Sequence, residues 1–208
     1  MIVFTESTKE NQFNCIQDVI DWSYDHYQHE MTDLNGKSIS ESERNKMKNQ
    51  DDKYNYISNH IYIKDWDNIL KTGKMCGCAE HSLLCIHFLK KFKIDYYPFF
   101  ITTCLSNNPS EREVLESGFS GKGMTHTSVL YRDENKKWHD IHFDVKNQMI
   151  FSSKNDALEK VFNSPKFKAK DKKQKRRLIM LPKNIKGNCK FYDYHKNFYK
   201  LSTLMEDK

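Results

Sequence analysis

The stretch of sequence that decides the fold is Met75-Cys76-Gly77-Cys78-Ala79-Glu80-His81-Ser82-Leu83-Leu84. An apolar pattern begins directly after Cys78, and its spacing predicts a central, mostly buried helix over residues 78–92. A cysteine at the start of a helix faces unpaired backbone N–H groups and the positive end of the helix dipole, which both favour a thiolate. Cys78 is therefore a candidate nucleophile. The neighbours that we expect to line the reacting atoms or supply oxyanion donors are Cys76, Gly77 and Glu80.

The segments on either side of this helix predict an α+β domain. Apolar residues at helical spacing predict a helix over residues 10–27 and a second helix that ends at Gly73. Segments rich in aromatic and β-branched residues, bounded by polar turns, predict strands further along the chain. These strands are residues 96–103, 125–132, 137–145, 149–151 and 178–181. We expect an antiparallel sheet with the Cys78 helix packed centrally on it.

Candidate partners for the thiol follow in the order histidine, then acid. His126 opens one predicted strand, and Asp140, His142 and Asp144 alternate along the next, so that their side chains share one face. Thiol chemistry needs an imidazole that takes and returns a proton, and an acceptor that holds its tautomer. We expect Cys78, His126 and Asp140 to form a catalytic triad. Asp144 and His142 are the alternatives, and a carboxylate is preferred because it also stabilises the imidazolium.

The length of the hairpin loop decides which side chain lies opposite His126. With a loop of residues 133–135, His126 pairs with His142, and with a loop of residues 134–136 it pairs with Asp144. With a two-residue loop, none of the three candidate side chains would share the face of His126. The sequence leaves these alternatives open.

Residues 73–145 resemble the transglutaminase-like superfamily, which includes peptide N-glycanases and protease-like relatives. In that family a cysteine opens a helix with a small residue four positions on, as Cys78 and Ser82 do. The family's histidine opens a strand and its aspartate closes the next, often after a tryptophan, which His126 and residues 138–144 resemble. The chain differs from the family at three positions, which are Cys76, Ser128 and His142.

This resemblance implies a papain-like core and a cysteine-dependent hydrolase or acyltransferase. The reaction would be acyl transfer or amide hydrolysis on a peptide or protein substrate, without a cofactor. A metal site is the chemical alternative, because Cys76, Cys78, His81 and Cys85 include soft ligands at helical spacing. Structural zinc sites usually have a second pair of ligands, which the sequence lacks, so we expect no metal.

Composition points to a polar globular protein, with 38% hydrophobic and 30% charged residues and no apolar run near membrane-span length. Polar residues follow Met1-Ile2-Val3-Phe4 at once, so we expect no ordinary secretory signal. The six cysteines are unevenly spaced and concentrated near the candidate site. We therefore expect reduced thiols and a cytoplasmic location.

The C-terminal part is strongly basic. Residues 146–208 contain 17 Lys and Arg against 6 Asp and Glu. We expect a catalytic domain over residues 1–165 and a basic extension over residues 166–208, packed in part on the same domain. An alternative function is a non-enzymatic binding module on the same fold, which recognises nucleic acid or another phosphate-rich partner through this extension. The basic residues concerned are Lys166, Lys168, Lys170, Lys172, Lys173, Lys175, Arg176 and Arg177.

Overall fold

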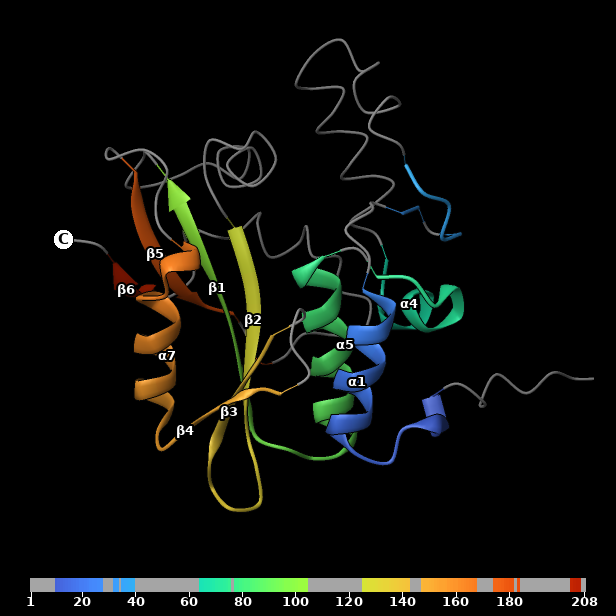
Figure 1. The fold of residues 1–208 in the computed structure, drawn as a ribbon, viewed down its shortest axis with the longest axis horizontal. Coiled ribbons are helices and arrows are strands. Elements are labelled where there is room, and N and C mark those ends of the chain that lie inside the picture. The colour runs from blue at the N-terminus through green and yellow to red at the C-terminus, as the bar shows by residue number, and fades with distance from the viewer. Residues whose placement is uncertain are drawn as a thin grey trace, which may run out of the picture.

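Six antiparallel strands form one sheet in the described part of the chain, in the order β4-β3-β2-β1-β5-β6 (Figure 1). The computed structural model describes residues 10–27, 32–33, 35–39, 64–75, 77–104, 125–142, 147–167, 174–181, 183 and 203–206. The strands are β1 (Tyr96–Cys104), β2 (Thr125–Arg132), β3 (Trp138–Ile141), β4 (Met149–Phe151), β5 (Lys175–Met180) and β6 (Thr203–Glu206). The helices are η1 (Glu10–Gln12), α1 (Ile16–His26), α4 (Trp66–Thr72), α5 (Cys78–Lys91), α7 (Lys154–Phe162) and η2 (Pro165–Phe167). The predicted α+β class is confirmed.

Helices cover both faces of the sheet. Figure 1 shows α1 and α5 on one side of it and α7 on the other. Each side has its own apolar core, because side chains alternate between the faces of a strand. The α5 side includes Val129 and Tyr131 of β2, and the α7 side includes Leu130 of the same strand. None of the helices in the described ranges is both long and apolar enough to cross a membrane.

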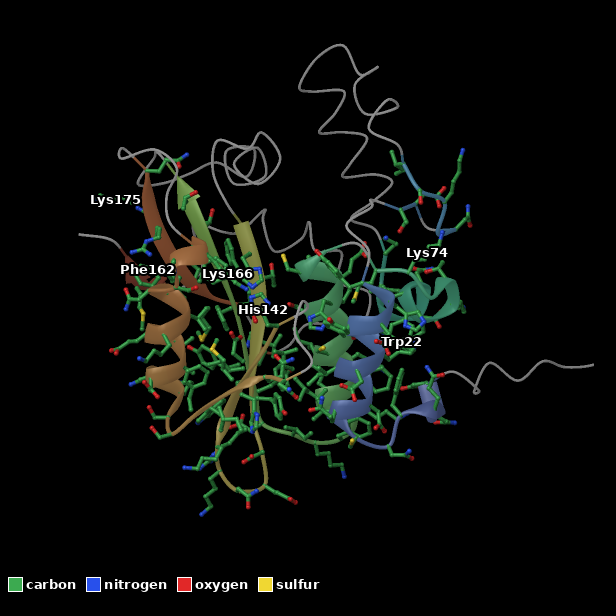
Figure 2. All side chains as sticks on the ribbon, in the orientation of Figure 1. Trp22, Lys74, His142, Phe162, Lys166 and Lys175 are labelled. Carbon is green, nitrogen blue, oxygen red and sulfur yellow. The ribbon has the colours of Figure 1, made fainter. Side chains whose placement is uncertain are left out.

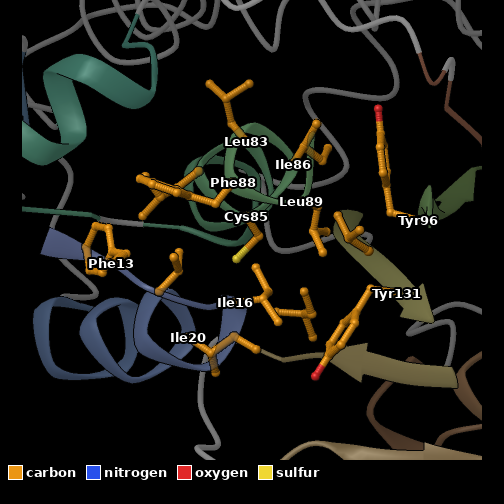
Figure 3. Close-up of a cluster of buried hydrophobic side chains, with 14 of the residues drawn as sticks. Phe13, Ile16, Ile20, Leu83, Cys85, Ile86, Phe88, Leu89, Tyr96 and Tyr131 are labelled. Atoms are coloured by element: carbon orange, nitrogen blue, oxygen red, sulfur yellow. The ribbon is translucent and has the colours of Figure 1, made fainter. Parts of the chain in front are cut away.

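The core on the α5 side explains why this helix is central. Ten of its residues are buried, from Ala79 to Leu89. Figure 3 shows Cys85 of α5 pointing toward Ile16 of α1, with Tyr131 of β2 beside them. Apolar side chains around most of the helix circumference therefore pack against a second helix as well as against the sheet.

The segment leading into α5 is held by local helix signals. The Asp65 side chain accepts a hydrogen bond from Asn68 N at 2.9 Å and caps the start of α4. Gly73 ends α4 in the left-handed conformation, with φ 64°, and donates its N–H to Ile69 O. Glycine adopts this conformation without steric cost, so the predicted stop at Gly73 is confirmed.

The β2–β3 hairpin adopts one of the three predicted registers. Val129 pairs with Ile141 and Arg132 with Trp138, which corresponds to the loop of residues 134–136. Lys136 has φ 62°, as expected for the last residue of a three-residue hairpin loop. In this register position 144 would face His126, but β3 ends at Ile141 and Asp144 lies outside the described residues.

The C-terminal part belongs to the same sheet. Strand β5 pairs with β1 from Phe99 to Cys104, and β6 pairs with β5. Helix α7 was not predicted, although Ser153 caps it by accepting a hydrogen bond from Asp156 N at 3.1 Å. Residues after 165 therefore contribute strands to the sheet that also carries His126.

Candidate active site

Cys78 is the first residue of α5, at the end of the sheet where β2 begins. Its Sγ accepts a hydrogen bond from the backbone N–H of Thr127 at 3.4 Å. Gly77 precedes the helix in an extended conformation, and no described atom lies within 4 Å of where a side chain would begin there. The nucleophile candidate therefore contacts the strand that carries His126.

Ser82 attaches the same helix to the same strand residue. Its hydroxyl donates to the carbonyl oxygen of Thr127 at 3.1 Å, and Ser82 is buried. Cys78 and Ser82 are four residues apart and so lie on one face of α5. Together they bind both backbone polar groups of Thr127.

Burial reverses the expected acidity of the Cys78 thiol. Although part of the residue reaches solvent, removal of the thiol from water raises its pKa above the ordinary value, and the charge of Glu80 raises it further. Hydrogen bonds from the backbone N–H groups of Thr127, Ala79 and Cys78 lower the pKa only in part. The expectation of a resting thiolate is therefore corrected, because desolvation outweighs the favourable start of the helix.

Glu80 forms a buried ion pair in the first turn of α5. Its Oε1 lies 2.7 Å from Lys64 Nζ, and the two side chains are only 7% and 1% exposed. Lys64 also donates to Thr32 Oγ1 at 2.7 Å. The carboxylate near the thiol is thus paired with a cation from the segment before α4.

His126 lies on the α7 side of the sheet. It pairs with Ile101 of β1, and its ring stacks on Phe167 of η2 with centroids 4.9 Å apart. The ring of His142 stacks on His126 at 5.2 Å. No hydrogen bond joins Cys78 Sγ to His126 within the described ranges. The expected pair is therefore close along the chain, through Thr127, but is not in hydrogen-bond contact.

Asp140 is buried beside these histidines. Its Oδ1 lies 2.9 Å from Ser128 Oγ, which is also 2.9 Å from the Ile141 carbonyl oxygen. Burial raises the pKa of the Asp140 carboxyl, while the Ser128 hydrogen bond and the charges of His142 and Lys166 act in the opposite direction. Figure 2 shows His142 and Lys166 in the region between α5 and α7. The direct hydrogen-bond partner of Asp140 on β2 is therefore Ser128.

Two of the predicted site residues, Cys76 and Asp144, lie outside the described residues. Sequence reasoning missed the site contacts of Thr127, Phe167 and Lys64. Because side chains alternate along a strand, the sequence could have indicated that the Thr127 side chain faces the side opposite His126. No sequence pattern near Phe167 or Lys64 pointed to the site.

The other candidate metal ligands of α5, His81 and Cys85, are buried in the core. His81 Nε2 lies 3.8 Å from Cys85 Sγ, and both residues are buried. Burial, with His142 nearby, lowers the pKa of His81 to about 3. Among the described residues there is no group of three His, Cys, Asp or Glu side chains that could hold a metal ion.

The basic segment is partly engaged in the fold. Arg176 donates to the Phe162 carbonyl oxygen at 3.0 Å, and its guanidinium lies 4.7 Å from the centre of the Phe162 ring. Arg177 is 8% exposed, and its backbone lies opposite that of Glu206 in the β5–β6 ladder. Lys166 and Lys175 are exposed. Recognition of an anionic partner stays a prediction, and Lys168, Lys170, Lys172 and Lys173 lie outside the described residues.

Comparisons with protein-family models, with curated proteins and with solved structures found no match for this chain.

Proposed function

We propose that the protein is a thiol enzyme that performs acyl transfer or amide hydrolysis on a peptide or protein substrate. The observation that carries the proposal is the contact between Cys78, the first residue of a buried helix, and the backbone of Thr127, next to His126. This arrangement brings a nucleophile and a candidate base to one end of the sheet. The core would be of the papain-like, transglutaminase-like type.

The reaction proceeds in two steps, which are the formation of a thioester on Cys78 and its cleavage. Cys78 Sγ attacks the carbonyl carbon of an amide while the thiol proton passes to the His126 imidazole. The C–N bond breaks, the proton moves to the leaving amine, and a thioester remains on Cys78. Water or a second amine then loses a proton to His126 and attacks the thioester, which releases an acid or a new amide and returns the proton to Sγ.

The raised pKa of Cys78 favours general-base activation over a preformed thiolate. His126 must turn from its stack on Phe167 toward the thiol when substrate binds. Catalytic hydrogen bonds often form only in the substrate complex. Backbone N–H groups at the start of α5 would stabilise the oxyanion, because the first N–H groups of a helix lack partners within it.

The proposal is tested by acetylation with p-nitrophenyl acetate, followed by mass spectrometry of the cysteine peptides. We expect Cys78 to be acetylated well ahead of Cys15, although Cys15 is exposed and Cys78 is only partly so. Only an activated, correctly placed thiol reacts faster than an exposed one. The products then distinguish the two reactions. Free acetate indicates hydrolysis of the acetyl-enzyme, and the acetylated form of an added amine indicates acyl transfer. Equal rates of acetylation at Cys78 and Cys15 would contradict the proposal.

The residue that orients His126 is identified by three substitutions. Asp140→Asn should lower turnover by about 10³-fold or more through loss of imidazole orientation, while the fold is kept. Asp144→Asn and His142→Ala test the alternatives. The matched control is Asp133→Asn, because Asp133 bonds His139 at 2.9 Å, away from Cys78 in the hairpin loop. If both site aspartates are dispensable and His142 is not, His142 is the third member.

A further inference from the structure

Thr127 is attached to α5 at two points. Its N–H donates to Cys78 Sγ, and its carbonyl oxygen accepts from Ser82 Oγ, at 3.4 and 3.1 Å. Thr127 and Ser82 are both buried, with exposed fractions of 3%. A backbone group buried without a partner costs free energy comparable to a lost hydrogen bond, so both contacts satisfy a physical requirement.

The early end of β3 explains this attachment. Asp133 donates its N–H to Lys137 O, and in an antiparallel ladder every second residue repeats that direction. The backbone groups of Val129 and Thr127 therefore face the β3 side. Val129 pairs with Ile141, the last residue of β3, so the ladder ends before it reaches Thr127. The side chains of Cys78 and Ser82 bind the two backbone groups of Thr127 beyond the described end of this ladder.

We propose that Ser82 is a positioning residue for the nucleophile, because its hydrogen bond to the Thr127 carbonyl holds the start of α5 against the strand that carries His126. The inference rests on the proposed function. Cys78 itself can act as an attachment only while Sγ is free. A thioester sulfur is a weak acceptor, so after acylation the Ser82 bond is the attachment to Thr127 that persists.

Acylation kinetics of three variants test this role. Ser82→Ala should lower the rate of Cys78 acetylation by p-nitrophenyl acetate, and kcat on any amide substrate, by about tenfold, with KM little changed. Ser82→Thr keeps the hydroxyl and should restore the wild-type values. Ser23→Ala is the matched control, because Ser23 is also buried but bonds Val19 O in its own helix and Cys85 of α5 and makes no bond to Thr127. Unchanged acetylation and kcat in Ser82→Ala would overturn the inference.

Hydrogen exchange of the Thr127 amide gives a readout that needs no activity. The amide should be protected in the wild-type protein and should exchange at least several-fold faster in Cys78→Ala and in Ser82→Ala, but not in Ser23→Ala. Equal protection in all four proteins would show that α5 does not depend on these contacts, and the inference would fall. A protein that follows this exchange pattern yet is never acylated faster at Cys78 than at Cys15 would refute the proposed function alone.

Discussion

Replacing Cys78 by alanine should abolish acylation at this position and lower turnover by on the order of 10⁴-fold or more, because removal of a covalent nucleophile leaves only binding and oxyanion stabilisation. The fold should survive, since Cys78 lies at the helix start and alanine is a favourable helix residue. The measurement is turnover of an amide substrate identified with the wild-type protein, together with circular dichroism of the variant.

Cys15→Ser is the control for this experiment. Cys15 is an exposed free thiol just before α1 and makes no contact with Thr127 in the described part of the chain. The variant should keep full turnover. Substantial activity in Cys78→Ala would mean that another group carries the reaction, and the assignment of the nucleophile would be abandoned.

Replacing Lys64 by methionine should destabilise the protein by about 3–5 kcal/mol, because it leaves the Glu80 carboxylate buried without its cation. The two charges are 2.7 Å apart and almost fully removed from solvent. The double variant Lys64→Met, Glu80→Leu should recover most of this loss, since an apolar pair of similar volume needs no charge compensation. Urea unfolding of the single and double variants measures the free energies.

Lys71→Met is the matched control for the buried pair. Lys71 Nζ lies 2.6 Å from Asp67 on the surface of α4, and both side chains are about half exposed. Its loss should change the free energy of unfolding by less than about 1 kcal/mol, because exposed ion pairs contribute little. A Lys64→Met variant as stable as Lys71→Met would show that Glu80 is compensated by other means.

The Lys64–Glu80 ion pair also affects the Cys78 thiol. Glu80 lies in the first turn of α5 and its charge opposes ionisation of Cys78. Lys64 neutralises that charge and links it to Thr32. The Lys64 side chain therefore lowers the free-energy cost of burying the Glu80 carboxylate near the Cys78 thiol.

The sequence by itself determined the elements that depend on nearby residues. The start of α5 at Cys78, the end of α4 at Gly73 and the strand pattern of residues 96–103 follow from apolar periodicity and local backbone preferences, which act within a few residues. The order of Cys78, His126 and Asp140 along the chain, and the shared face of the candidate acids, followed from the same local rules.

Only the tertiary structure decided how these elements meet. Sequence left three hairpin registers open, and the fold selected one of them through the pairing of β3 with β2 and β4. Cys78 and Ser82 of α5 bind the backbone of Thr127, while Phe167 of η2, which follows α7 in the chain, stacks on His126. The helix start favoured an acidic Cys78, but burial raises the pKa of this thiol instead. Local sequence describes the dipole of a helix, whereas desolvation depends on every segment that packs around it, which is why the direction of the Cys78 pKa shift follows from the fold.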